Sequence, residues 1–272
     1  MPAFSNWTTP PQTFNFNWTP ARLFYDTNAN GAWFDPSDMT TLFQDAAMTI
    51  PVTASGQLVG AMRDKSGRNN HVYQTDNSKR PTFTIDANDL HSITFANGKF
   101  LISNKNVPFS RSNGAYLGIM TKQNTNVNDA RMFVAGSTGS GSSAQTTSGF
   151  GISAGGASEY FGYYSGNVLT RTLGTGPTPL GVYEATIANN TLQLYANGVA
   201  GQSNSSSTFL TTTGPIGFGV EISSGAPSQS QAWQQYIGEI YGFIYIGGRV
   251  VTAAEMSSAR SYQMIKTKQV SI

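Results

Sequence analysis

The sequence predicts an all-β protein, a sandwich of two antiparallel sheets with an extended N-terminal arm and a short C-terminal helix. Turns are expected to be frequent, because 29 of the 272 residues are Gly and 12 are Pro. Only 11% of the residues are charged, whereas 12% are aromatic, a balance that favours strands. Short runs with strand character recur at intervals of roughly 8 to 12 residues, which is typical of β-sandwiches.

Charge and cysteine content narrow the classes of function. The formal net charge is +2 and the 16 basic residues are dispersed, so we expect no nucleic-acid partner. Since the chain has no Cys, disulfides, thiol catalysis and Cys-based metal sites are excluded. No apolar run approaches about 18 residues, so we expect no membrane segment. No secretory leader is readable at the N-terminus.

Residues 1–28 differ from the rest and are expected to form an extended arm. They hold two copies of a short motif, Asn6–Pro10 and Asn17–Pro20, and proline disfavours regular ladders. The aromatic residues of this arm are poor candidates for free exposure, so we expect them to pack on their own domain or on a neighbouring subunit. The expected subunit anchors are Trp7, Phe14, Phe16 and Trp18.

Residues 29–272 are expected to form the sandwich domain, which opens with mixed structure. Trp33–Phe43 predicts a short strand, an Asp-Pro turn and a brief helical turn. Asp64–His71 then predicts an Asx-type turn with Gly67 at positive φ. His71, at the end of this loop, is expected to fix it by hydrogen bonding rather than to act as a base.

The same loop offers a weak alternative, a calcium site. Asp64 and Ser66 carry side-chain oxygens at alternate positions, and calcium takes oxygen ligands. Arg68 stands where a third ligand would help, so the turn is the preferred interpretation. Neither His71 nor His91 lies in a metal-binding pattern, and we therefore assign no metal and no cofactor.

Strand signals fill the region between residues 81 and 247. The expected strands are Thr82–Ile85, Ser92–Phe95, Phe100–Ser103, Tyr116–Thr121, Arg131–Ala135, Gly149–Ser153, Tyr160–Tyr164, Val168–Thr172, Val182–Ala188, Thr191–Ala196, Thr208–Thr211, Ile216–Val220 and Gly238–Ile246. Hairpin turns are predicted at Asn97-Gly98, Asn189-Asn190 and Asn197-Gly198, because Asn and Gly tolerate positive φ. Gly136–Ser148 and Ser203–Ser207 are expected to be loops.

The C-terminal segment is predicted to be a helix that runs to about Lys266. Thr252 and Glu255 match a capping box, in which each side chain bonds the other residue's backbone amide. Val251 and Met256 fit a hydrophobic staple at the same helix end. The apolar strand Tyr241–Ile246 is expected at the centre of its sheet, because an apolar edge strand invites aggregation.

Three groups of segments resemble known proteins. Gly31–Asp45, with Thr49–Val52 and Gly56–Gly60, resembles a recurrent opening in tailed-phage and prophage structural proteins, as does Asp64–His71 with Arg80–Thr82. The closing segments are similar to the last strands and terminal helix of concanavalin A-like, laminin G-like jelly rolls; they are Leu192–Gly198, Ile237–Ile246 and Val251–Met256. The resemblance covers roughly residues 30–270. It implies a jelly-roll sandwich in a virion protein, and it supplies no ligand.

The acidic residues do not match the simplest glycosidase pattern. Hydrolysis of a glycoside needs two carboxyl groups about 5 to 9.5 Å apart. On one strand, such a pair would be spaced by two or four residues, and none of the five Glu residues has another acid at that spacing. Glutamates on separate strands could still meet in space. The five are Glu159, Glu184, Glu221, Glu239 and Glu255.

A nucleophile motif is also present, at Gly151–Gly155. It places Ser153 in a Gly-x-Ser-x-Gly pattern, which requires a strand before the Ser and a helix after it. The residues that follow are a poor helix start, and both His residues precede Ser153. We therefore interpret this match as chance and expect no catalytic residue.

Aromatic residues supply the candidate glycan contacts. On a strand, Tyr160 and Tyr164 would share one face. Trp233 follows a loop rich in Ser and Gln. These three side chains are expected to lie in the core or a subunit interface, where Tyr is enriched, or else to stack on sugar rings.

We therefore expect a non-enzymatic virion structural protein, such as a capsid decoration, head-fibre or tail-attached component. It would dock on capsid or tail subunits as a homo-oligomer. The alternative hypothesis is a glycan- or receptor-binding module on the virion surface, and a polysaccharide depolymerase is a third hypothesis. Glycan binding that is lost on replacing Tyr164 or Trp233 would favour the glycan-binding hypothesis.

Overall fold

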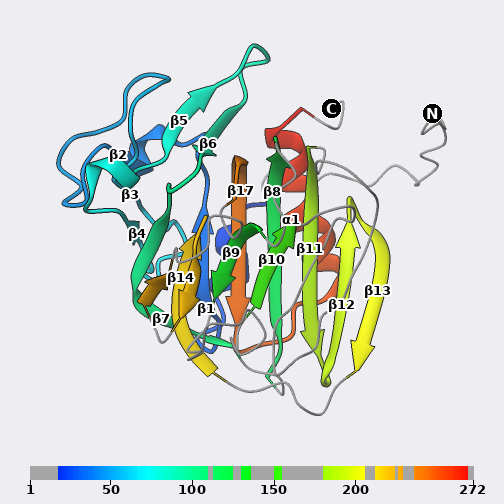
Figure 1. Ribbon diagram of the computed structural model, residues 1–272. Coiled ribbons are helices and arrows are strands. Elements are labelled where there is room, and N and C mark those ends of the chain that lie inside the picture. Colours follow the sequence, from blue (N-terminus) through cyan, green and yellow to red (C-terminus); the bar gives the residue numbers. More distant parts are fainter. Residues whose placement is uncertain are drawn as a thin grey trace.

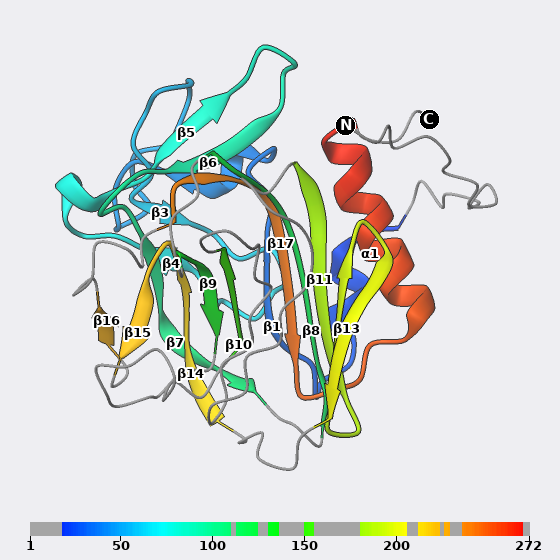
Figure 2. The same cartoon turned by 45° about the vertical axis from the view of Figure 1, so that its right-hand side comes forward.

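The computed structural model describes residues 18–109, 113–124, 130–135, 150–154, 180–205, 212–223, 226–228 and 236–268. Within them, two antiparallel sheets pack over a shared apolar core, and one α-helix lies on the outer face of one sheet (Figures 1 and 2). The predicted fold class, an all-β sandwich with a short C-terminal helix, is confirmed.

Sheet A is the larger of the two sheets, with eight strands among the described residues. In spatial order these are β13 (Val199–Ser205), β12 (Thr191–Ala196), β11 (Gly181–Ala188), β8 (Ala115–Gln123), β17 (Gly238–Gly247), β6 (His91–Phe95) and β5 (Thr82–Ile85), and β1 (Asn30–Phe34) also pairs with β17. The apolar strand β17 therefore lies inside the sheet, between β8 on one side and β6 and β1 on the other, as predicted.

Sheet B faces the core from the other side. Its described strands, in spatial order, are β10 (Phe150–Ala154), β9 (Ala130–Ala135), β14 (Thr212–Phe218), β7 (Leu101–Phe109), β4 (Val72–Tyr73), β3 (Ala61–Met62) and β2 (Leu42–Phe43). A separate ribbon pairs β15 (Glu221–Ser223) with β16 (Ala226–Ser228). The described residues also form three short 3₁₀ helices: η1 (Pro20–Phe24), η2 (Met39–Thr41) and η3 (Asn77–Lys79).

Alternation along the strands separates the two faces of sheet A. On β8, Leu117 and Ile119 lie in the core between the sheets, whereas Tyr116 and Met120 lie on the outer face. Phe243 of β17 meets Phe218 of sheet B edge-to-face, with ring centroids 4.9 Å apart. Aromatic rings from both sheets therefore fill the centre of the sandwich.

The helix α1 (Ala253–Lys266) covers the outer face of sheet A, as Figure 2 shows. Its predicted capping box is present, because the Thr252 side chain accepts from the Glu255 amide and the Glu255 carboxylate accepts from the Thr252 amide. Val251 and Met256 lie in one apolar cluster with Trp33, as the staple prediction requires. The N-terminal segment η1 packs into this cluster as well.

Two predicted hairpin turns are confirmed, and one is wrong. Asn189 and Asn190 have φ of 49° and 63°, and Asn197 and Gly198 have φ of 49° and 83°, as type I′ turns require. Asn97-Gly98 does not close a hairpin. β6 pairs within sheet A and β7 within sheet B, so this turn passes the chain from one sheet to the other.

One loop prediction is partly wrong, and several predicted segments cannot be compared with the structure. The expected loop Ser203–Ser207 is partly wrong, because β13 continues to Ser205 through its pairing with β12. The expected strands at 160–164, 168–172 and 208–211, and the expected loop 136–148, lie outside the described residues. In the described part of the chain, no helix has the length and apolar character needed to span a membrane.

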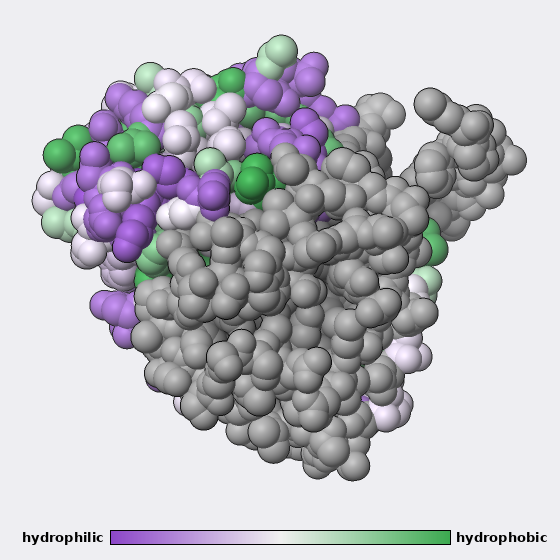
Figure 3. All heavy atoms as spheres, viewed as in Figure 1, coloured by the Kyte–Doolittle hydropathy of each residue, from purple (hydrophilic) through white to green (hydrophobic). Residues whose placement is uncertain are grey.

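The described surface seen in Figure 3 is mainly hydrophilic around β5, β6 and the β2–β4 region, with scattered hydrophobic residues. Four large hydrophobic side chains are exposed among the described residues: Tyr25, Ile50, Val199 and Val250. Isolated exposed side chains of this kind are normal on a folded protein and need no special explanation.

Candidate functional site

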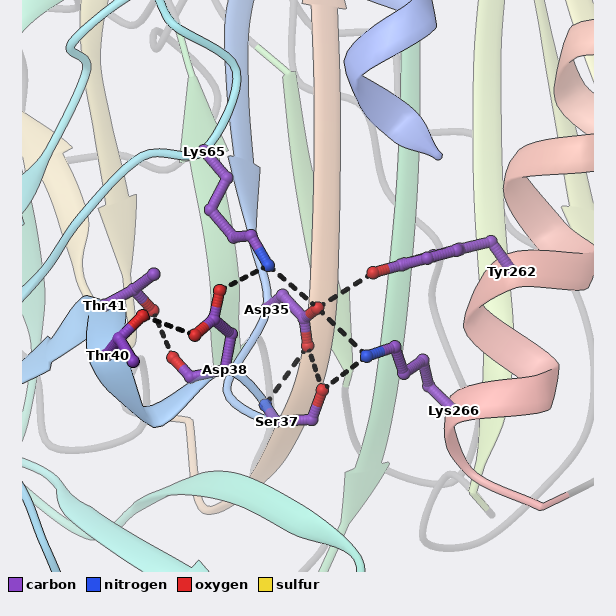
Figure 4. A network of polar contacts seen from close by, with 8 residues as sticks. All are labelled: Asp35, Ser37, Asp38, Thr40, Thr41, Lys65, Tyr262 and Lys266. Carbon is purple, nitrogen blue, oxygen red and sulfur yellow. Dashed lines mark hydrogen bonds and ion pairs between the residues drawn. The ribbon is translucent and has the colours of Figure 1, made fainter. Parts of the chain in front are cut away.

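The main polar cluster joins the end of β1 to the C-terminal half of α1. We call it the Asp35 network, and Figure 4 draws its members: Asp35, Ser37, Asp38, Thr40, Thr41, Lys65, Tyr262 and Lys266. Asp35 follows the last residue of β1, and η2 begins at Met39 after an Asp-Pro turn, as predicted. Tyr262 and Lys266 are four residues apart, so they project from one face of α1.

Asp35 is the centre of this network and is only 3% exposed. Its Oδ1 accepts hydrogen bonds from the Ser37 amide, at 3.1 Å, and the Ser37 hydroxyl, at 2.5 Å. Its Oδ2 accepts from the Tyr262 hydroxyl at 2.8 Å. The ammonium groups of Lys65 and Lys266 lie 3.3 and 3.4 Å from the same oxygen. The carboxylate thus ties a loop, a strand end and a helix together.

Asp38 is the second acid of the network. Its Oδ2 lies 2.7 Å from the Lys65 ammonium, so Lys65 bridges the two carboxylates. Its Oδ1 accepts from the Thr40 hydroxyl at 2.6 Å, and its backbone carbonyl accepts from the Thr41 hydroxyl at 2.7 Å. These contacts hold the turn that follows β1.

The electrostatics of this pair favour two ionised acids. Burial opposes ionisation of Asp35, but the hydrogen bond from Ser37 and the charges of Lys266 and Lys65 outweigh it, so the pKa lies below 3.8. The pKa of Asp38 is also lowered, because its contacts with Lys65 outweigh burial. Glycoside hydrolysis requires one protonated carboxyl group beside an ionised one. This pair therefore offers no proton donor at neutral pH.

A hollow lies beside the network, between α1 and the outer face of sheet A. Its volume is about 240 Å³, including space open to solvent. Aromatic residues line it, together with polar residues of α1 and Asp35, which follows β1. Its lining includes Trp33, Asp35, Tyr241, Tyr262, Gln263 and Lys266.

A second buried acid, Glu184, lies under α1 with no exposed surface. Its Oε1 accepts from the Tyr116 hydroxyl at 3.0 Å, and its Oε2 accepts from Arg260 Nε at 2.5 Å. Burial raises the pKa of Glu184, and the Arg260 guanidinium only partly offsets that effect. The contact between Glu184 and Arg260 holds α1 on the sheet. Because the Glu184 carboxyl group has no exposed surface, it is out of reach of a substrate.

The Asp64 loop folds as the predicted Asx-type turn, with Gly67 at φ of 81°. The Asp64 carboxylate accepts four hydrogen bonds, from the Trp33 amide, the Ser66 amide and hydroxyl, and the Asn70 amide. His71 accepts from the Asp64 amide through Nδ1 at 2.9 Å, so it fixes the loop. In the described part of the chain, no group of three His, Cys, Asp or Glu side chains could hold a metal ion.

The remaining acids have separate surroundings. Glu255 caps α1 and pairs with Arg249 at 2.8 Å. Glu239 accepts from the Asn124 amide and from the Tyr241 hydroxyl, each at 3.0 Å. Glu221 begins β15, whose side chains are not described, and Glu159 lies outside the described residues. Ser153 lies in β10 opposite Arg131, and the residues that follow β10 are not described.

Of the predicted subunit anchors, Trp18 is the one within the described residues. Its ring meets that of Tyr262 on α1 in an edge contact, with centroids 6.3 Å apart. This segment therefore contacts its own domain. The other anchors, Trp7, Phe14 and Phe16, and the glycan candidates, Tyr160, Tyr164 and Trp233, lie outside the described residues.

Sequence reasoning missed the role of the Asp35 network. It singled out the segments that hold Asp35 and Lys65, but it assigned them only local turns. Lys65 and Tyr262 lie 30 and 227 residues from Asp35 in the chain, yet both contact its carboxylate. One signal was available in the sequence: Tyr262 and Lys266 are spaced to lie on one face of the C-terminal helix, where they could pair with an acidic turn such as Asp35–Asp38.

Solved structures of similar fold include arabinofuranosidases and sialidases. An arabinofuranosidase complexed with arabinofuranosyl-α-1,2-xylobiose matches with a TM-score of 0.64 and 12% identity, over 92% of this chain and 65% of that chain. A GH54 α-L-arabinofuranosidase soaked with a cyclic sulfate inhibitor gives a TM-score of 0.58, 12% identity and the same coverage. Trypanosoma rangeli sialidase in complex with sialic acid gives 0.54 and 11%, over 88% of this chain and 34% of that chain.

No family model matches this chain, and no curated protein sequence matches it significantly. At 11–12% identity, the structural likeness shows the fold alone. The class of protein is therefore a two-sheet antiparallel β-sandwich. These neighbours provide no link to a phage.

The expectation of a non-enzymatic protein is corrected by these neighbours. The solved structures that cover most of this chain are glycoside hydrolases. For paired carboxyl groups, the sequence argument tested only acids spaced along a single strand and left open pairs from separate strands. It had no means of testing carboxyl groups that separate elements bring together, and the fold gives no ground for excluding catalysis.

Proposed function

We propose that this chain is a carbohydrate-recognising β-sandwich module whose ligand is an oligosaccharide. The observation that carries the proposal is the match over 92% of the chain to an arabinofuranosidase that was solved with a bound arabinofuranosyl-xylobiose. The sialidase, solved with sialic acid, is a second carbohydrate-directed protein of similar fold. This chain spans 65% and 34% of those proteins, so their activities do not transfer as a whole.

The sugar would bind away from the outer face of sheet A. α1 covers that face, and the buried acids beneath and beside it, Glu184 and Asp35, are already paired with protein groups. Aromatic side chains with a few polar groups are typical of small-ligand sites. Tyr160, Tyr164 and Trp233 remain the candidate contacts on sequence grounds.

A glycan array with the purified full chain tests this proposal. Binding to one class of glycan is expected, with a loss of at least about tenfold in affinity for Tyr164→Ala or Trp233→Ala, which corresponds to about 1.4 kcal/mol. The matched control is Tyr25→Ala, because the Tyr25 side chain is 78% exposed and its loss disturbs little packing. Binding unaffected by both site variants would remove these residues from the proposal.

Release of reducing sugar from the glycans that bind distinguishes recognition from hydrolysis. An array with no binding above background, together with no sugar release, would overturn the carbohydrate proposal altogether. Both assays use the intact chain, because α1 and η1 at opposite ends of the sequence pack together.

We further propose that the module is carried on a virion, where it docks on capsid or tail subunits as a homo-oligomer. The support is the resemblance of residues 30–270 to tailed-phage structural proteins and the aromatic arm. Replacing Trp7, Phe14 and Phe16 together by Ala is expected to release the protein from particles. Retention on particles, or a monomer in light scattering, would count against this proposal.

A further inference from the structure

We propose that the hollow between α1 and sheet A is a binding site for one ordered water molecule, held by the side-chain amide of Gln263. The site lies beside the Asp35 network, on the helix-covered face of the sandwich. The proposal rests on the surroundings of Gln263 alone, so it stands or falls independently of the proposed function.

The unusual feature of this hollow is a buried amide without partners. Gln263 is only 3% exposed. Neither its Nε2 nor its Oε1 has a hydrogen-bond partner among the described residues. Buried polar side chains are nearly always paired, and leaving one unpaired costs free energy. The amide presents an NH2 donor group and a carbonyl acceptor side by side, so its natural partner is a small neutral molecule that can both accept and donate.

Two glycines form the floor under this amide. A Cβ atom on Gly118 of β8 would lie 2.8 Å from Gln263 Nε2, and one on Gly242 of β17 would lie 3.7 Å from Oε1. Gly118 therefore cannot carry a side chain without displacing the amide. Gly242 has room for a small one, and this open side of the amide adjoins the hollow.

The size and lining of the hollow fit water better than a larger or charged ligand. There is room for the centre of about one water molecule, which needs two to four polar partners to be stable. The Asp35 carboxylate already faces Lys65 and Lys266, so the site has no unpaired charge to attract an ion. Besides Gln263, the residues that line the hollow include Tyr262 and Lys266, which carry further polar groups.

Direct detection comes first. In the full-length protein, a nuclear Overhauser contact between a long-lived water and the side-chain amide protons of Gln263 is expected. Absence of that contact, in a sample whose amide protons are assigned, would overturn the proposal. This measurement uses the unmodified protein and does not depend on whether any variant folds.

Gln263→Met gives the second test, because methionine has a similar volume and no amide. If water pairs with the amide, the variant loses those hydrogen bonds and its Tm is unchanged or falls. A dry hollow predicts the opposite, because removing an unpaired buried amide raises the Tm. The matched control is Gln193→Met, since Gln193 Nε2 donates to the carbonyls of Leu194 and Gly201, and its loss is expected to lower the Tm.

A pair of substitutions at Gly242 replaces the water by a protein group. Gly242→Ser places a hydroxyl beside Gln263 Oε1, whereas Gly242→Ala fills the same space without a donor. Comparing Ser with Ala cancels the backbone effect of replacing glycine. The Ser variant is expected to melt about 2–4 °C above the Ala variant. The difference should disappear in the Gln263→Met background, and a difference that persists there would contradict the geometry of the site.

Discussion

Glu184 provides the most demanding test of how α1 is held on the sandwich. Its carboxylate has no exposed surface, and it accepts hydrogen bonds from Tyr116 and Arg260. Glu184→Ala removes the acceptor and leaves a buried phenol and a guanidinium without their partner. Breaking a buried ion pair from one side typically costs about 3–5 kcal/mol.

The structure places the expected loss near the lower end of that range. The Arg260 side chain is 19% exposed, so water partly compensates its charge once the carboxylate is gone. A loss of about 3 kcal/mol corresponds to a fall in Tm of roughly 6–12 °C for a chain of this size. Glu184→Gln keeps an acceptor for Tyr116 and should lose less.

Urea denaturation followed by tryptophan fluorescence and circular dichroism measures this effect. The matched control is the double variant Glu184→Met with Arg260→Met, which removes both charges. It is expected to recover most of the lost stability, because only the Tyr116 hydroxyl is left without its partner. The reasoning fails if Glu184→Ala costs under about 1 kcal/mol, the scale of one ordinary hydrogen bond. It also fails if the double variant is as unstable as the single one.

Four further outcomes are expected. Thr252→Ala should cost about 1 kcal/mol in urea denaturation, because it removes the helix cap, and unchanged stability would contradict the cap. Tyr262→Phe should lower the free energy of unfolding by about 1.5–3 kcal/mol, the value of a hydrogen bond to a charged group. A smaller loss would show that the hydrogen bond from Tyr262 to Asp35 adds little stability. The pKa of Asp35 is lower in the folded state than its ordinary value of 3.8, so its ionised contacts stabilise the fold above about pH 4, and this stabilisation is lost as the pH falls further. The Tm of Asp35→Asn should therefore fall less in acid than the Tm of the wild type. An equal fall of Tm in the two proteins would refute this. Chelation with EDTA should leave the Tm unchanged, because four protein hydrogen bonds occupy the Asp64 carboxylate, and a lower Tm would reveal a bound metal.

Local patterns predicted much of the fold. Thr82–Ile85 and Thr191–Ala196 have the predicted bounds, because alternation and the Asn-rich turns define them from neighbours in the sequence. The capping box at Thr252 is equally local. β3 and β4 were not predicted, since two-residue strands carry no readable period. They depend on distant partners, because β4 pairs with β7 and β3 pairs with β4. The hairpin predicted at Asn97-Gly98 was wrong, because this dipeptide specifies a turn but does not determine which sheet the next strand joins.

The polar sites were harder to predict, because each needs partners from distant parts of the chain. Glu184 alternates within a strand like any outward-facing residue, and only the position of α1 buries it. Asp35 is close in sequence to Ser37 and Asp38, so a turn was predictable there, but Lys65 and Tyr262 reach it from two other elements. The sequence contains these residues without any local signal of their contact.

The position of β17 has a consequence for how the protein is made. This strand comes late in the sequence, yet it pairs with β1, β6 and β8. A ribosome-bound chain that ends before Gly238 therefore holds three strands whose hydrogen-bonding edges have not met their partner. Such long-range pairing slows folding, and the nascent polypeptide must remain protected from aggregation until its last portion emerges.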